Sequence, residues 1–233
     1  IYTNLKINTL PDKSIVERYF EALKPLNIHN DGQGLDYFIP EGEKIKNDDI
    51  PMSHWAGYIG FVIGGSFETK KMPLAKWKEL CTLSPIPIVL LGGPEDKELG
   101  DEIALLDPVK IYNSCGKFSI NESADLVQLA KIIVSNDTGL MHVAAAFKKP
   151  IISLWGNTTP EMGMFPYFGY NNLKSNVAPN LLIVENKNLS CRPCSKIGYD
   201  TCPKKHFNCM NQLLFNEVDS FFKKYLFPPN HFG

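Results

Sequence analysis

The sequence predicts an α/β fold, a Rossmann-like doubly wound parallel sheet with helices on both faces. Short apolar runs without polar alternation recur along the chain, as in strands buried on both faces of a sheet. Segments with helical spacing alternate with them, and parallel strands need such crossover connections. The 233 residues can bury a sizeable core, and the formal net charge of −1 gives no basic stripe of the kind that grips nucleic acid.

Residues 1–52 are expected to form an interdomain helix and linker segment. The first seven residues are strand-like, and because the chain opens on Ile1 rather than Met we expect a piece of a longer protein. Apolar residues recur at helical spacing within 12–26, behind Pro11 and Asp12 as start signals. The polar, Gly-containing stretch 27–49 is then predicted to be an exposed linker.

A compact nucleotide-sugar-binding unit is expected over 53–210, followed by a C-terminal helix and tail at 211–233. Apolar runs predict strands at 58–63, 86–91, 109–112, 132–135, 150–154 and 181–184. Helical spacing predicts helices at 74–83 behind Pro73, 95–106, 119–131 capped by Ser119 or Asn121, a short Ala-rich one after Gly139, and 211–226. The inner face of the last helix should carry Leu213, Leu214, Val218, Phe221 and Phe222.

Polar residues follow the first two strands. Glycines at 64–65 allow the backbone to approach a phosphate closely, and Ser66 and Lys70 add a hydroxyl and a charge. The spacing is not that of a Walker A loop, so an ordinary solvated turn is the alternative. Glu95, after the second strand, is suited to accept hydrogen bonds from ribose hydroxyls, although a first-turn Glu also favours the helix dipole.

A third polar segment follows the strand at 132–135. Asp137, Thr138 and Gly139 lie at a helix start, where side chains and amides suit an anion, and His142 comes one turn later. Taken singly, Asp137 is explained as a helix cap and His142 as a structural histidine. Because loops at the carboxyl ends of parallel strands form the ligand crevice of such sheets, the three segments are expected to converge on one site.

These residues carry a resemblance to a known family. The run 137–146, with Pro150, 154–156, 158–160 and 166–167, resembles the signature of glycosyltransferase family 9, the ADP-heptose:lipopolysaccharide heptosyltransferases. The similarity extends to Ser66, Lys70, Glu95 and 117–119, and covers most of 55–210. It implies the C-terminal, donor-binding domain of a B-type glycosyltransferase fold, without the N-terminal half that holds the family's general base.

The resemblance also implies a mechanism and roles. An acceptor hydroxyl, deprotonated by a carboxylate of the missing half, displaces a nucleoside diphosphate with inversion, so this chain should bind the donor but not transfer sugar alone. Lys70 and Asp137 are the expected catalytic residues. Donor binding is assigned to Ser66, Lys70, Glu95, Phe118, Asp137, Thr138, Gly139 and His142, with Glu95 on the ribose and Phe118 near the base. The donor is expected to be an ADP-sugar such as ADP-heptose, the acceptor a lipopolysaccharide core, and no cofactor is required.

A cysteine-rich loop at 189–210 leaves two interpretations open. Cys191 and Cys194 have the spacing of a zinc knuckle, which Cys202 with His206 or Cys209 could complete. Free thiols or a disulfide in an irregular loop are the alternative, and the favoured assignment is no metal. Two other cysteines, Cys81 and Cys115, are expected to be small core residues.

Two rival functions remain: another sugar-nucleotide enzyme of the same architecture, such as an epimerase, or a non-catalytic nucleotide- or zinc-binding module. No apolar run approaches the roughly 20 residues that span a bilayer, and no signal peptide opens the chain. A cytoplasmic location is therefore expected, with peripheral contact to the inner face of the inner membrane through the missing half.

Overall fold

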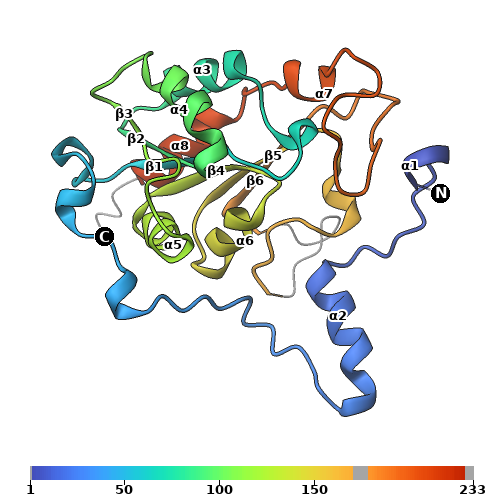
Figure 1. The fold of residues 1–233 in the computed structure, drawn as a ribbon. Coiled ribbons are helices and arrows are strands. Elements are labelled where there is room, and N and C mark those ends of the chain that lie inside the picture. Colours follow the sequence, from blue (N-terminus) through green and yellow to red (C-terminus); the bar gives the residue numbers. More distant parts are fainter. Residues whose placement is uncertain (1, 170–177, 229–233) are drawn as a thin grey trace.

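The computed structural model describes residues 2–169 and 178–228. Ile1, 170–177 and 229–233, which fall within the expected N-terminal segment, compact unit and tail, lie outside the described residues. In the described part, a six-stranded parallel sheet is covered by helices on both faces (Figure 1), which confirms the predicted α/β class. Its order is β3-β2-β1-β4-β5-β6, the order of a dinucleotide-binding Rossmann sheet.

The strands form where the sequence places continuous apolar runs. They are β1 (Ile59–Val62), β2 (Ile88–Leu91), β3 (Ile111–Asn113), β4 (Ile132–Asn136), β5 (Ile151–Trp155) and β6 (Leu181–Glu185). All residues of β1, β2, β4 and β5 are buried, as expected for strands covered on both faces. The centre of the sheet pairs β1 with β4, in register from Ile59 opposite Ile132 to Val62 opposite Ser135.

Two hydrophobic clusters lie on opposite faces of the sheet. One face is covered by α3 (Leu74–Leu83), α4 (Lys97–Ala104) and α8 (Val218–Leu226), through residues such as Trp77, Ile103 and Phe222. The other is covered by α5 (Ile120–Leu129) and α6 (Gly139–Ala146), through Leu126 and Met141 among others (Figure 1). Cys81 and Cys115 are buried in the first cluster, as predicted.

Helix boundaries follow local capping. The predicted helix at 74–83 has those bounds, and Ser119, rather than Asn121, caps α5 in a capping box with Glu122. The predicted helix at 95–106 is shorter, because residues 94–96 form a 3-10 turn before α4. In the N-terminal segment, Ser14 and Glu17 form the capping box that starts α2 (Ile15–Leu23), later than the expected Asp12.

Two expectations at the chain ends are wrong. The segment expected as a strand contains instead a single helical turn, α1 (Tyr2–Leu5), which ends at Lys6 in a left-handed conformation. There the Lys6 ammonium bonds the carbonyls of Cys191 and Pro193, so this stretch is held by side-chain contacts and not by strand pairing.

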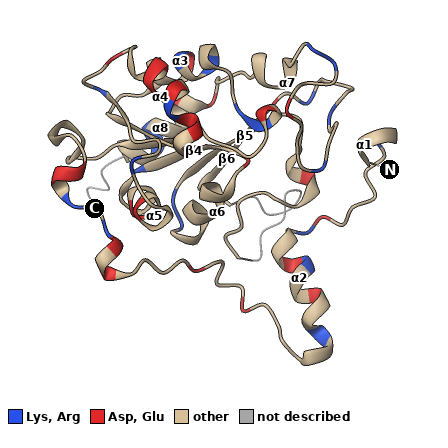
Figure 2. Cartoon of the chain, viewed as in Figure 1, with Lys and Arg blue, Asp and Glu red and all other residues tan. Residues whose placement is uncertain are grey.

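The predicted helix at 211–226 is divided in two. A short helix, α7 (Asn208–Asn211), precedes an irregular stretch, and α8 begins only at Val218. Leu214, expected on the inner face, is 71% exposed, whereas Leu213 and Phe215 enter the core from the irregular stretch. Charged residues of both signs are interspersed on the helices, for example along α2 (Figure 2).

Candidate functional site

The predicted site residues gather at the switch point of the sheet, where the strand order reverses between β1 and β4. In open α/β sheets ligands bind outside the carboxyl ends of the strands at this point. Asn136, the last residue of β4, donates its amide to the carbonyls of Ile63 (2.9 Å) and Gly64 (3.2 Å). This bond pair fixes the exit loop of β1 against that of β4.

A buried ion pair joins these two loops. Lys70 Nζ lies 2.7 Å from Asp137 Oδ2, with side chains 17% and 6% exposed. Thr158, in the exit loop of β5, donates its hydroxyl to the same oxygen at 2.9 Å. The exit loops of β1, β4 and β5 thus meet at one carboxylate oxygen, which joins the two predicted catalytic residues, Lys70 and Asp137.

Asp137 is therefore not the helix cap that the sequence alone also allowed. The residue at the cap position of α6 is Thr138, whose hydroxyl does not bond back to the helix. A Cβ placed on Gly139 would have no described atom within 4 Å, so the helix start faces open space. The first amides of α6 and the Thr138 hydroxyl are accessible to an anion, with the positive end of the helix dipole behind them.

His142 stands one turn into α6, close enough to the ion pair for both charges to act on it. Burial of the imidazole lowers the pKa of His142 below its ordinary value of 6.5; the Asp137 charge opposes this shift and the Lys70 charge adds to it. The side chain is consequently neutral at neutral pH. A neutral imidazole offers one donor and one acceptor nitrogen to a polar ligand.

Beside the helix start is a cavity of about 320 Å³. Of the predicted donor-binding residues it is lined by Ser66, Glu95, Phe118 and Thr138, which follow β1, β2, β3 and β4 in turn. Glu95 is exposed in the 3-10 turn at 94–96. Its carboxylate is free of the described hydrogen bonds and ion pairs, which leaves it available to ribose hydroxyls. Lys70, Asp137, Gly139 and His142 do not line this cavity. Asp137 and Gly139 flank Thr138 in the sequence, and Lys70 is connected to them by its ion pair with Asp137.

The sequence analysis missed a second buried ion pair, one member of which, Asp96, lines the cavity. Asp96, 2% exposed, contacts Lys71 Nζ at 3.1 Å and accepts a hydrogen bond from the Gly93 amide at 3.0 Å. Burial opposes the charge on Lys71, but hydrogen bonds to Glu68 and Asp96 outweigh it and raise the pKa of the ammonium. The pair holds the exit loops of β1 and β2 at a fixed separation. In the sequence, its one visible sign is that Lys71 and Asp96 directly follow the predicted site residues Lys70 and Glu95.

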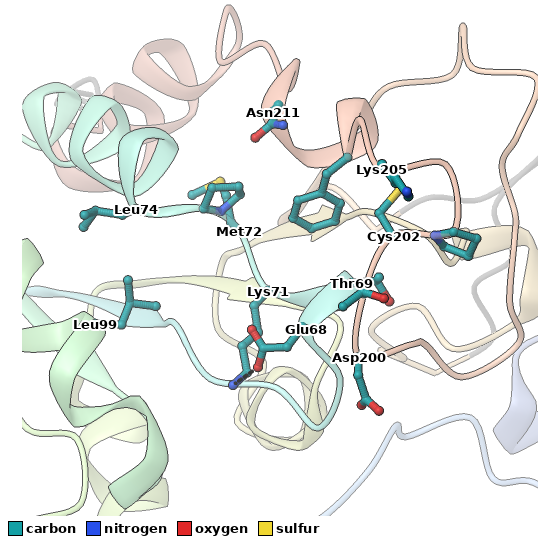
Figure 3. A pocket seen from close by; sticks show the side chains of 14 residues that line it. Glu68, Thr69, Lys71, Met72, Leu74, Leu99, Asp200, Cys202, Lys205 and Asn211 are labelled. Atoms are coloured by element: carbon teal, nitrogen blue, oxygen red, sulfur yellow. Dashed lines mark ion pairs between the residues drawn. The ribbon is translucent and has the colours of Figure 1, made fainter.

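A larger cavity, of about 850 Å³, is lined by residues 68, 69 and 71–74, by Leu99 and by residues of the stretch 200–211 (Figure 3). Its lining is largely apolar, from Met72, Leu74, Leu99 and Phe207, and the Glu68 and Lys71 side chains lie against one another at its edge. None of the predicted donor-binding residues lines it. The polar groups suited to a nucleotide surround the smaller cavity, so we place the site there.

The cysteine-rich loop shows no metal centre. All six cysteines are free, and in the described ranges 2–169 and 178–228 no group of three or more His, Cys, Asp or Glu side chains is arranged to hold a metal ion. Cys191 Sγ and His206 Nε2 are 4.0 Å apart. The polar group around which the loop is bonded is instead Arg192, a buried residue that the sequence analysis did not select. It is one of two arginines in the chain, and this rarity was the one sequence feature that could have drawn attention to it.

Comparison with known proteins gives a family. The profile of Glycosyltransferase family 9 (heptosyltransferase) matches residues 2–204. Lipooligosaccharide heptosyltransferase 2 of Haemophilus influenzae is 31% identical over 170 residues, which are 67% of this chain and 47% of that protein. Lipopolysaccharide heptosyltransferase 2 of Salmonella typhimurium is 34% identical over 132 residues, 53% of this chain and 38% of that protein. The chain spans about half the length, or less, of these curated relatives.

Solved structures agree on the fold. The Escherichia coli heptosyltransferase WaaC with ADP is 25% identical, with a TM-score of 0.61 over 95% of this chain and 60% of that one. A family 9 glycosyltransferase from Veillonella parvula is 22% identical, with a TM-score of 0.59 over 80% of this chain and 54% of that one. Among the described residues of the present chain, no helix combines the length and apolar character needed to cross a membrane.

Proposed function

The chain belongs to glycosyltransferase family 9, and we propose that it binds the nucleoside diphosphate of an ADP-sugar and stabilises that group as it leaves. The observation that carries the proposal is the meeting of Lys70, Asp137 and the start of α6 at the switch point of the sheet. The relative solved with ADP shares this fold at 25% identity, which supports adenine as the base. ADP-heptose is the proposed donor, because the matched relatives are heptosyltransferases.

The charge that develops on the diphosphate decides which groups contribute most. A unit charge about 4 Å away at an effective dielectric constant of about 20 interacts by about 4 kcal/mol. A helix terminus contributes about 0.3–2 kcal/mol. Asp137, 2.7 Å from Lys70 Nζ, offsets part of the lysine charge. Lys70 therefore stabilises the diphosphate together with the amides of Thr138 and Gly139 and the hydroxyl of Ser66, which add directional hydrogen bonds.

The lining of the smaller cavity supports proposed roles for the other residues. Glu95 would accept hydrogen bonds from the ribose hydroxyls, and Phe118 would pack against the base, both at the cavity of about 320 Å³. His142, neutral near pH 7 because of its lowered pKa, would hold a phosphate or sugar oxygen. Asp137 would act chiefly through Lys70, whose ammonium it orients.

Family membership supports a proposal for the acceptor and for the cellular location. We propose transfer to a lipopolysaccharide-core type of acceptor by the complete enzyme, at the cytoplasmic side of a bacterial membrane. The relatives named above act in lipopolysaccharide or lipooligosaccharide assembly by their names. An epimerase finds no support among these relatives, and a zinc module finds none in the arrangement of the described cysteines.

Calorimetric titration of the chain with ADP, UDP and adenosine tests donor binding. ADP should bind. Lys70→Ala should weaken ADP binding at least tenfold, the equivalent of about 1.4 kcal/mol, and leave the binding of adenosine unaffected. Lys223→Ala is the matched control, because Lys223 is 69% exposed on α8, away from the site. A wild-type chain that binds no nucleotide would refute the proposal.

A further inference from the structure

The cysteine-rich loop contacts the exit of β5 through one guanidinium group. Arg192, whose side chain is 4% exposed, donates from Nε to the Gly156 carbonyl (2.5 Å), from Nη1 to Asn186 (2.7 Å) and from Nη2 to Thr158 (3.0 Å). Its charge is matched by Glu185 at the end of β6, 3.0 Å away and 5% exposed. A buried arginine with all its nitrogen atoms engaged in this way is a rigid joint between segments.

The same loop holds the whole exit of β5. Arg192 Nη2 also approaches the Trp155 carbonyl at 3.4 Å, and the Cys194 amide donates to the Asn157 carbonyl at 3.1 Å. Four successive carbonyls, 155–158, are thus bonded by residues 192–194. Because these partners come from one short segment, a shift of Arg192 displaces the β5 exit as a unit.

Thr158 connects this joint to the proposed donor site. Its carbonyl accepts from Arg192 and its hydroxyl donates to Asp137 Oδ2, the oxygen that contacts Lys70. We propose that Arg192 is a positioning residue for donor binding, which sets the Lys70–Asp137 pair through Thr158. This inference rests on the proposed function, since it concerns the same diphosphate site, and it gives the cysteine-rich loop a role that needs no metal.

Arginine is required at this position because of its shape. The planar guanidinium presents donors in several fixed directions, whereas a lysine ammonium is a single centre and cannot serve the separate carbonyls of Gly156, Asn186 and Thr158 together with Glu185. Arg192→Lys therefore keeps the charge while releasing most of the joint. A purely structural Arg192 would affect folding stability without a specific effect on the diphosphate site.

Calorimetry with ADP on the full chain tests the link. Arg192→Lys and Thr158→Val should each weaken ADP binding by about tenfold, since sites lose function steeply when supporting contacts loosen. The Arg192→Lys, Thr158→Val double variant should bind ADP no more weakly than the weaker-binding single variant, because both changes interrupt the same chain of contacts. Thr158→Ser keeps the hydroxyl and should restore binding. Arg18→Lys is the matched control, since the Arg18 side chain, among the described residues, donates only to the carbonyls of Met162 and Pro11.

Hydrogen exchange without ligand separates this inference from donor binding itself. Exchange of the amides at 141–145, which are bonded within α6, should be faster in Arg192→Lys and Thr158→Val than in the wild type and Arg18→Lys. Wild-type affinity in Thr158→Val, additive losses in the double variant, or unchanged exchange at 141–145 would each overturn the positioning role. If the wild type fails to bind ADP while the variants still exchange faster than the wild type, donor binding is refuted and the chain of contacts from Arg192 to Asp137 remains supported.

Discussion

Replacing Lys70 by Met is expected to destabilise the ligand-free protein more than replacing Asp137 by Asn. Lys70→Met leaves a 6%-exposed carboxylate whose remaining hydrogen bond, among the described residues, comes from Thr158. Breaking a buried pair in this way costs about 3 kcal/mol. Asp137→Asn keeps an acceptor for Thr158 and leaves an ammonium that is 17% exposed. Because a lysine stem is long enough to carry its charge to water, this change should cost about 1 kcal/mol.

The double variant measures the pair itself. With both charges removed, the loss should be about 1.5 kcal/mol against about 4 for the summed singles, a coupling of about 2.5 kcal/mol. Urea unfolding at constant pH gives the free energy of unfolding of the wild type, the two single variants and the double variant. The matched pair Lys223→Met and Asp219→Asn on α8, 69% and 56% exposed, should show a coupling of only about 0.3–0.5 kcal/mol. Equal losses for the two single variants, or an additive double variant, would refute the reasoning.

Three further outcomes are expected. A bound diphosphate should raise the lowered pKa of His142, so that binding takes up a proton. The affinity for ADP-ribose, measured by calorimetry, should therefore rise about threefold from pH 8 to pH 6. His142→Gln should abolish this rise. Glu95→Gln should weaken ADP by about tenfold and leave 2′,3′-dideoxy-ADP unchanged; equal losses for both ligands would contradict a ribose contact. Gly64→Ala, whose Cβ would overlap Asp96 Oδ2, should cost about 1–3 kcal/mol in urea unfolding, whereas Gly139→Ala should leave stability unchanged and weaken ADP.

The sheet was predictable because its signals are local. A run such as 58–63 is apolar throughout and bounded by glycine, and the helix at 74–83 is preceded by Pro73, which fixes the backbone angle of the first turn. The C-terminal helix was not predictable in the same way. Leu213 and Phe215 are buried from an irregular stretch, so their spacing imitates a continuation of α8 although the backbone there is not helical.

The sequence could select candidate residues for the site, but not the contacts between them. Family signature and position at strand ends selected Lys70 and Asp137, and in the structure their charged groups lie 2.7 Å apart. The role of Asp137 as a helix cap was equally consistent with the sequence, since capping depends on which residue takes the cap conformation, and that residue is Thr138. Thr158 lies in the segment 158–160 of the family signature, but its contact with Asp137 was not predicted, and Arg192 was not selected. These contacts join positions 21 and 34 residues apart, a separation that no local pattern encodes.

The Lys70–Asp137 ion pair determines how the proposed donor site can work. A diphosphate that reaches Lys70 meets an ammonium already held by Asp137, whose oxygen is in turn held by Thr158. Little reorganisation is then needed as charge develops, which is the condition under which fixed charges stabilise a transition state most. The opposing effect is that Asp137 repels the incoming anion, so the site exchanges some ground-state affinity for orientation. Because Arg192 fixes Thr158 from the opposite side, the cysteine-rich loop belongs to this balance, and its packing should influence donor binding although it lies outside the cavity.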